Sequence, residues 1–126
     1  MLASSPVAAV IAVVDLDRGK EFYGGTLGLK ESDAGDPGGV LYACGNGTQL
    51  LVYQSSFAGT NQATAAGWQV DDIDAEVSAL QSRGIAFEQY DMPGVEREGD
   101  IHSIGDLRAA WFKDPDGNIL NLVARP

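Results

Sequence analysis

The sequence predicts an α+β fold made of two consecutive copies of one βαβββ module. Two observations support this prediction: the order strand, helix and three strands runs twice along the 126 residues, and short motifs recur in the same order. The composition, 44% hydrophobic and 21% charged, is typical of a globular chain, and the length fits one domain. We therefore expect a single domain over residues 1–126, with modules at 7–54 and 64–124.

The first module begins with a continuous apolar stretch over residues 7–14, which is typical of a strand covered on both faces. Its odd positions carry the larger side chains, so we expect the odd face to lie under helices and the even face to line a narrower space. A helix over about 15–26 follows. Asp15 or Asp17 can cap its start, and Gly28 ends it.

Three strands complete the first module. Turn-forming residues in the segments DAGDPGG and GNG separate them, and the polar, small-residue stretch SSFAGTNQ marks the seam between the two modules. We place these strands at about residues 29–32, 40–44 and 48–54.

The second module repeats this order. Its helix is predicted by Ile73, Val77 and Leu80, which follow helical spacing, and by Gly84, which supplies the stop. A polar loop and the turn DPDG interrupt the strands. The predicted strands are 64–70, 85–90, 107–113 and 118–124, and the predicted loop covers about 91–106.

Internal repetition supports the duplication. VVDLD, which ends at Asp17, matches VDDID, which ends at Asp74, at an offset of 57. NGTQLLVY matches DGNILNLV when Gly47 is aligned with Gly117, at an offset of 70. The two matches occur in the same order. The second offset is larger because the second half contains a longer loop.

Charge and cysteine content limit the binding partners and the cellular location that we expect. Eighteen acidic and eight basic residues give a net charge of −10, which repels nucleic-acid phosphates and anionic lipids. We expect no nucleic-acid and no membrane partner, because the apolar run at 7–14 is also far shorter than a membrane helix. The single cysteine, Cys44, cannot form an internal disulfide, so a cytoplasmic location is expected. We interpret Cys44 as a small buried residue rather than a nucleophile.

Three motifs occur together in the right order: VVDLDRGKEFYGGTLGL early, VDDIDA in the second half, and WFKDPDGNILNLV at the end. With them, the chain from about residue 7 to 123 resembles the vicinal oxygen chelate superfamily, which includes glyoxalase I, extradiol dioxygenases, fosfomycin-resistance transferases and bleomycin-resistance proteins. The resemblance implies mixed sheets that curve into a half-barrel, with helices outside and a cup inside. It also implies a homodimer, with which exposed sheet edges agree.

In metal-dependent members, the resemblance implies four metal ligands on the first and fourth strands of each module. These places correspond to Ala8, Leu51, Ala65 and Asn121. Alanine and leucine offer no lone pair, and asparagine offers one carbonyl oxygen. We therefore expect no metal and no other cofactor, and we do not expect a metal-dependent glyoxalase or dioxygenase. A divalent-metal lyase with displaced ligands is the least favoured alternative.

The side chains expected inside the cup share the parity of those four positions. They are small or apolar with a few amide and phenol groups, which favours binding of a small hydrophobic or aromatic molecule. Trp111 and Phe112 are adjacent and face opposite ways, and we place Trp111 on the open side, where it could stack on a planar ligand or pack at a subunit contact. The expected ligand-binding residues are Val10, Gln49, Leu51, Tyr53, Gln69, Trp111 and Asn121.

A metal-independent enzyme of the isomerase, cyclase or lyase type is the alternative function. Its candidates for proton transfer are Tyr90, Asp91 and His102. For His102 the competing interpretation is a solvated loop histidine, and for Tyr90 and Asp91 it is a polar strand end. The charged residues at 96–100 could form a mobile lid or a cation-binding rim.

Overall fold

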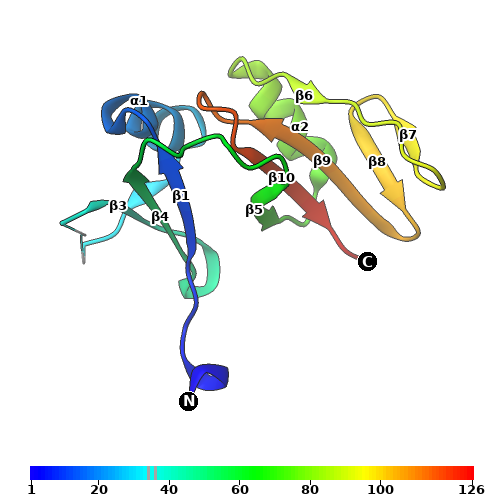
Figure 1. Cartoon of the computed structure of the whole chain (residues 1–126). Coiled ribbons are helices and arrows are strands. Elements are labelled where there is room, and N and C mark those ends of the chain that lie inside the picture. Colours follow the sequence, from blue (N-terminus) through cyan, green and yellow to red (C-terminus); the bar gives the residue numbers. More distant parts are fainter. Residues whose placement is uncertain (34, 36) are drawn as a thin grey trace. The chain divides into compact units, whose positions relative to one another are not determined.

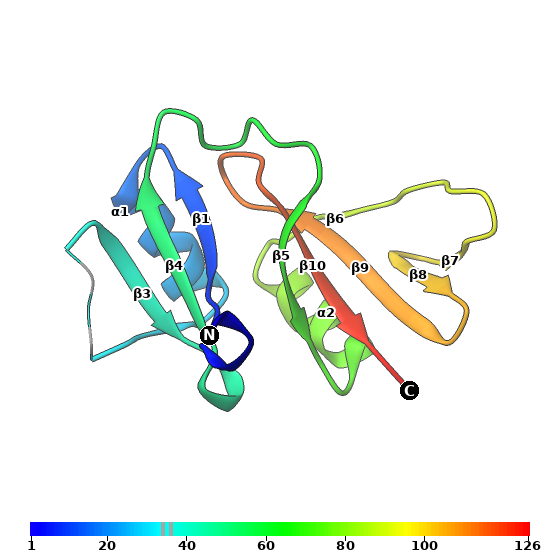
Figure 2. The ribbon, with the colours of Figure 1, turned by 60° about the horizontal axis from the view of Figure 1, so that its bottom comes forward.

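The computed structural model describes residues 1–33, 35 and 37–126 and confirms the α+β class. The chain forms two compact units. The first unit comprises residues 1–61 together with 115–118, and the second comprises 62–114 and 119–126. Each contains one open sheet with helical segments beside it, as Figures 1 and 2 show.

The sheet of the first unit has four strands in the order β1-β4-β3-β2. β1 runs parallel to β4, and the other neighbours are antiparallel. Short 3-10 turns occur at Leu2–Ser4 and Gly45–Gly47. The main elements are β1 (Ala9–Val13), α1 (Leu16–Lys20) continued by a π-helical stretch (Glu21–Thr26), β2 (Lys30–Glu31), β3 (Gly39–Ala43) and β4 (Gln49–Gln54).

The first helix forms where the sequence predicts it. The Asp15 carboxylate accepts hydrogen bonds from the backbone N–H groups of Asp17 and Arg18, which caps the helix start. Helical backbone then continues through Thr26, and Gly28 follows with φ +74°. On β1, Ile11 and Val13 are buried, as expected for the odd face, but Val10 is 54% exposed, so the prediction of a strand covered on both faces is wrong. The strand itself starts at Ala9, two residues later than predicted.

The second unit holds a longer sheet in the order β5-β10-β9-β8-β7, and β6 also pairs with β9. β5 runs parallel to β10, and β10, β9, β8 and β7 are antiparallel neighbours. Its elements are β5 (Thr64–Gln69), α2 (Ile73–Ser82), β6 (Phe87–Glu88), β7 (Glu96–Glu98), β8 (Ile101–Ile104), β9 (Leu107–Lys113) and β10 (Ile119–Ala124).

Helix α2 covers one face of this sheet, where it packs on β9 and β10. The Asp72 carboxylate accepts a hydrogen bond from the Ala75 N–H and caps its start. Its predicted apolar stripe of Ile73, Val77 and Leu80 is buried. Phe112 is fully buried in this unit, and its ring contacts those of Trp68 and Phe87 at centroid distances of 6.5 and 5.4 Å.

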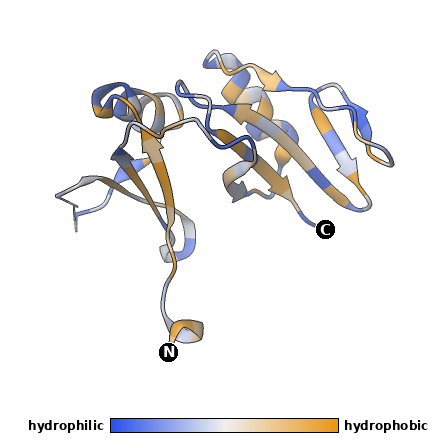
Figure 3. Cartoon of the chain, in the orientation of Figure 1, coloured by the Kyte–Doolittle hydropathy of each residue, from blue (hydrophilic) through white to orange (hydrophobic). Residues whose placement is uncertain are grey.

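The segment 91–106 departs from the prediction of a loop, because the β7–β8 hairpin forms inside it. Residues 99 and 100 connect the two strands, with Gly99 at φ +63°. β8 then pairs with β9 and buries Ile101 and His102. β7 itself is exposed and appears in the hydrophilic colours of Figure 3. Within the described part of the chain, no helix is both long and apolar enough to cross a membrane.

Candidate functional site

The sheet of the second unit has one face turned away from α2, which we call the open face. Alternation along β9 directs Ala110 and Phe112, both buried, toward the helix and Trp111 toward the open face. Trp111 pairs with Asn121 on β10, and Asn121 pairs with Gly67 on β5. A tryptophan, an amide and a glycine therefore lie side by side across three strands.

Trp111 lies along the open face instead of standing out from it. Its indole Nε1–H donates a hydrogen bond of 3.0 Å to Oγ1 of Thr64 on β5. Because β10 lies between β9 and β5, and neighbouring strands are about 4.8 Å apart, the indole must extend across β10 to make this bond. Thr64 thus fixes the ring as a platform, and sequence alternation did not identify this partner.

Asn121 leans toward the same strand, β5, where its side chain lies over Gly67. A Cβ atom at residue 67 would overlap the Oδ1 atom of Asn121, so the amide occupies the space that glycine leaves. The Asn121 side chain forms no hydrogen bond with another described residue, and the residue is only partly buried. Its amide keeps both donor and acceptor capacity at the edge of the Trp111 platform.

His102 joins the open face from β8, where it pairs with Ala109. It is fully buried, and its Nε2 accepts a 2.9 Å hydrogen bond from the backbone N–H of Tyr90. Tyr90 lies just beyond β6, outside the strand ladder, so the imidazole replaces a missing backbone acceptor there. An Nε2 that accepts leaves the proton of a neutral imidazole on Nδ1, and this buried Nδ1 has no partner among the described residues.

Three rings surround this point, and we call Tyr90, His102 and Trp111 the aromatic cluster. The imidazole and the indole meet edge to face at 4.9 Å between centroids, and Tyr90 lies 5.9 and 5.6 Å from them. Burial, and secondarily the negative charge of Glu88, raises the pKa of the Tyr90 phenol. The phenol therefore stays protonated at neutral pH.

The predicted proton-transfer candidates separate in the structure. Tyr90 and His102 come together, whereas the Asp91 side chain is 93% exposed and faces Arg97 at 3.4 Å. The interpretation of His102 as a solvated loop histidine is wrong, since it is a buried strand residue. The misassigned loop caused this error.

The charged residues of the β7–β8 hairpin make contacts of their own. Arg97 pairs with His102 across β7 and β8, and its guanidinium donates to the Gly99 carbonyl. Asp100 accepts hydrogen bonds from the amides of Gln81 and Gln89 at 2.7 and 2.9 Å. Two of the charged residues at 96–100, for which a mobile lid or a cation-binding rim was predicted, therefore form hydrogen bonds with nearby residues.

The sheet of the first unit has an open face of simpler chemistry. Val13 packs against Gly19 of α1, so alternation turns Val10 to the opposite face, where it pairs with Leu51. Val10 is 54% and Tyr53 37% exposed. The predicted ligand-binding residues of this half, Val10, Gln49, Leu51 and Tyr53, share this face. In the second half Gln69 is exposed and shares the parity of Gly67.

The four positions that correspond to metal ligands do not fit a divalent cation. Ala8 precedes β1, and Ala65 is the extra residue of a β-bulge opposite β10. Among Ala8, Leu51, Ala65 and Asn121, only the asparagine carries a donor atom. Among the described residues, no three His, Cys, Asp or Glu side chains are grouped as metal ligands would be.

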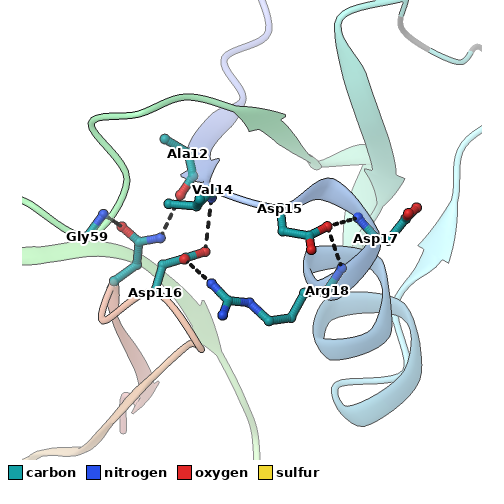
Figure 4. A network of polar contacts seen from close by, with 8 residues as sticks. Ala12, Val14, Asp15, Asp17, Arg18, Gly59 and Asp116 are labelled. Carbon is teal, nitrogen blue, oxygen red and sulfur yellow. Dashed lines mark hydrogen bonds and ion pairs between the residues drawn. The ribbon is translucent and has the colours of Figure 1, made fainter.

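Residues 115–118 of the DPDGN motif belong to the first unit, where they form the polar network of Figure 4. The amide of Asn118 donates to the Ala12 carbonyl at 2.8 Å and accepts from the Gly59 N–H at 3.2 Å. Asp116 accepts from the Val14 N–H at 3.3 Å and pairs with Arg18. The motif predicted a turn, and the structure adds these long-range contacts.

Comparisons with solved structures find the same fold over nearly the whole chain. TnmS3, an antibiotic binding protein from Streptomyces sp. CB03234, is 24% identical, with 98% of each chain covered and a TM-score of 0.64. A glyoxalase/bleomycin resistance protein from Catenulispora acidiphila DSM 44928 is 22% identical, with 98% of this chain and 100% of that chain covered and a TM-score of 0.71. The fosfomycin resistance protein FosX from Listeria monocytogenes is 14% identical, with 98% and 94% covered and a TM-score of 0.69.

A comparison with curated proteins finds no match. A family model, by contrast, matches residues 6–122, almost the full length. The resemblance seen in the motifs is thereby confirmed, and the chain belongs to the glyoxalase/bleomycin resistance protein/dioxygenase superfamily.

Proposed function

We propose that this protein binds a small hydrophobic or aromatic molecule, without a metal ion, on the open face of its second unit. The observation that carries the proposal is the Trp111 indole, which Thr64 holds across β10 beside the Asn121 amide, a group with no hydrogen bond to another described residue. A flat aromatic surface with a few polar groups is typical of sites for planar apolar ligands. Solved structures of the same fold include one described as an antibiotic binding protein, which supports the proposal.

The charge of the chain favours an uncharged ligand over an anionic one, because a net charge of −10 repels anions at long range. Stacking on Trp111 then supplies affinity through burial of apolar surface, at about 25 cal/mol per Å². The donor and acceptor of Asn121 supply orientation. The open face of the first unit, with Val10, Leu51 and Tyr53, offers a second apolar surface of the same kind.

The test is a titration with 9-fluorenone, a flat uncharged aromatic ketone, followed by isothermal titration calorimetry, because the variants below each remove one of the two tryptophans of the chain. Trp111→Leu keeps an apolar side chain but removes the platform, and we expect at least a tenfold loss of affinity. Trp68→Phe is the matched control, because Trp68 stacks on the buried Phe112 and not on the open face. Trp68→Phe should bind as tightly as the wild type. Equal affinity of Trp111→Leu and wild type would refute the proposal.

A metal-independent isomerase, cyclase or lyase is the second candidate, and the pairing of Tyr90 with His102 favours it. A protonated phenol lies 5.9 Å, centroid to centroid, from an imidazole with an unpartnered nitrogen. General acid–base chemistry on a carbonyl compound would exchange its α-protons with solvent. Deuterium exchange into 1-indanone in D₂O, followed by NMR, tests this, and His102→Gln should abolish any catalysed exchange.

We also propose that the protein is a homodimer and is located in the cytoplasm. The superfamily resemblance supports the homodimer, and the single cysteine supports the cytoplasmic location. Native mass spectrometry of the freshly purified protein measures subunit number, bound ions and co-purified molecules in one spectrum. A metal-free dimer with an organic adduct supports the proposal, and one divalent ion per chain contradicts it.

A further inference from the structure

We infer that the aromatic cluster recognises its ligand through an oxygen atom of the ligand. This oxygen accepts a hydrogen bond from Nδ1–H of His102. The ligand class is then a planar, uncharged aromatic molecule with a carbonyl-type oxygen on or beside the ring. This inference rests on the proposed function and names the chemistry of its ligand. It starts from the one buried side-chain nitrogen that the structure leaves without a partner among the described residues.

The tautomer of His102 follows from its contact with Tyr90. A backbone N–H can only donate, so the Nε2 atom that receives it at 2.9 Å must present a lone pair. The neutral ring then carries its proton on Nδ1, which is a donor. Buried donors in native proteins almost always have acceptors, and one without an acceptor is costly. A ligand oxygen at Nδ1 would supply the missing partner.

The charges beside this donor favour an acceptor over a cation. Arg97 pairs directly with His102 across the β7–β8 hairpin, and its guanidinium lies near Asp91 at 3.4 Å. Lys113 lies on β9 two residues from Trp111, and its ammonium faces Glu88 at 3.7 Å. The phenol of Tyr90 stays protonated and is a further donor. The two carboxylates in these contacts, Asp91 and Glu88, thus each face a cationic side chain, and the phenol adds a donor, which favours an acceptor over a cation.

Because Nδ1 is buried, a ligand reaches it only if a neighbouring group moves, and we assign this movement to the Tyr90 ring. Thr64 anchors the Trp111 indole, whereas the Tyr90 hydroxyl forms no hydrogen bond with another described residue. His102 holds the Tyr90 backbone, whereas the Tyr90 ring is placed by its packing against the His102 and Trp111 rings. The ligand would therefore replace the Tyr90 ring against His102 while its own ring stacks on Trp111.

The experiment uses two flat probes that differ at one group, 9-fluorenone with a ring carbonyl and fluorene with a methylene. Because His102 is the sole histidine of the chain, ¹⁵N-histidine labelling reports on this one imidazole. We expect fluorenone to bind about tenfold more tightly than fluorene. Fluorenone should shift the Nδ1 resonance and leave Nε2 as the acceptor, and fluorene should leave both unchanged.

The outcomes separate the inference from the proposed function. Equal affinity for the two probes, with the Nδ1 resonance unmoved, overturns the inference and leaves the proposed function standing. Failure of both probes to bind overturns both. A free-state spectrum with the proton on Nε2 overturns the inference before any ligand is added.

Two substitutions provide a matched check. In His102→Gln, the side-chain carbonyl can reach the place of Nε2 and accept from Tyr90, but nothing donates from the place of Nδ1. In His102→Asn, the amide nitrogen takes the place of Nδ1 and the acceptor for Tyr90 is lost. We expect His102→Gln to keep its melting temperature and lose the preference for fluorenone. His102→Asn should keep the preference and melt at a lower temperature. If His102→Asn loses the preference for fluorenone and His102→Gln keeps it, the inference is overturned. If neither variant folds, the ¹⁵N-histidine spectrum of the wild-type protein with each probe tests the inference.

Discussion

Two asparagines three residues apart, Asn118 in the first unit and Asn121 in the second, have opposite environments. Asn118 is 7% exposed, and its side-chain amide donates to the Ala12 carbonyl and accepts from the Gly59 N–H. The Asn121 amide engages neither with another described residue. Polar groups with satisfied hydrogen bonds hold the chain in place, and polar groups left unsatisfied on a structured surface are available to a ligand.

Two glycines extend this contrast. Gly59 makes room for the backbone carbonyl of Asp116 and adopts φ +71°, a conformation that favours glycine. Gly67 makes room for the movable side chain of Asn121 and lies in an ordinary strand. Substitutions at Gly59 should therefore affect folding, and substitutions at Gly67 should affect the site.

Gly59→Ala should have the largest effect. The new methyl group overlaps a backbone oxygen, which cannot move as a side chain can, and alanine is strained at positive φ. We expect a loss of about 3 kcal/mol in the free energy of unfolding, measured by urea denaturation. Gly47→Ala is the matched control, since φ is +75° there and the space is open. Its loss should be near 1 kcal/mol. Equal losses would show that the contact with Asp116 is unimportant.

Asn118→Ala should follow, with a loss of about 2 kcal/mol, because it leaves the Gly59 N–H and the Ala12 carbonyl without a partner. Asn118→Asp keeps the acceptor for Gly59 but places a carboxylate oxygen against the Ala12 carbonyl oxygen at a buried position, so its loss should be at least as large. Fluorenone affinity should be unchanged in both variants. A change in affinity without a change in unfolding would contradict the separation between the two asparagines.

Gly67→Ala should have a smaller effect on stability, about 1 kcal/mol, because the Asn121 side chain can rotate away from the new methyl group. Rotation places the amide against the Trp111 platform, so fluorenone binding should weaken several-fold. The double variant Gly67→Ala/Asn121→Ala should recover stability. A double variant as unstable as the sum of the two single changes would exclude this contact as the cause.

Asp74→Asn should have the smallest effect. The hydrogen bond from Arg108, at 2.8 Å, holds the pKa of the Asp74 carboxyl below its usual value. A lowered folded-state pKa gives stability that is present above the ordinary value and is lost as the pH falls through the folded pKa. The stability gap between wild type and Asp74→Asn should thus be small at pH 7 and vanish at strongly acidic pH. Urea melts at both pH values measure it, and a gap that widens on acidification would contradict the assignment.

Local patterns predicted the elements that depend on neighbouring residues. The alternation of side chains placed Val10, Leu51 and Trp111 on the open faces, and an acidic cap placed the helix start at Asp15. The helix stripe at Ile73 was equally local. These features require no knowledge of distant contacts.

The features that sequence reasoning missed all depend on distant partners. The β7–β8 hairpin forms because β9 offers an unpaired edge, and the sequence of 91–106 alone does not reveal that edge. The burial of His102 follows from the same pairing. The bulge at Ala65 turns Thr64 toward Trp111, and no residue of β5 signals it. Contact between Asn118 and Ala12 links residues more than a hundred positions apart.

The assignment of residues 115–118 to the first unit affects how the chain is made. A ribosome releases the chain from its N-terminus, and most small domains complete their contacts as they emerge. Here the partners of Ala12, Val14 and Arg18 are synthesised about a hundred residues later. The first unit therefore lacks these contacts until almost the whole of the second half has been translated. A gene cut at the boundary between the two halves would encode a first half without the residues that complete its hydrogen bonds.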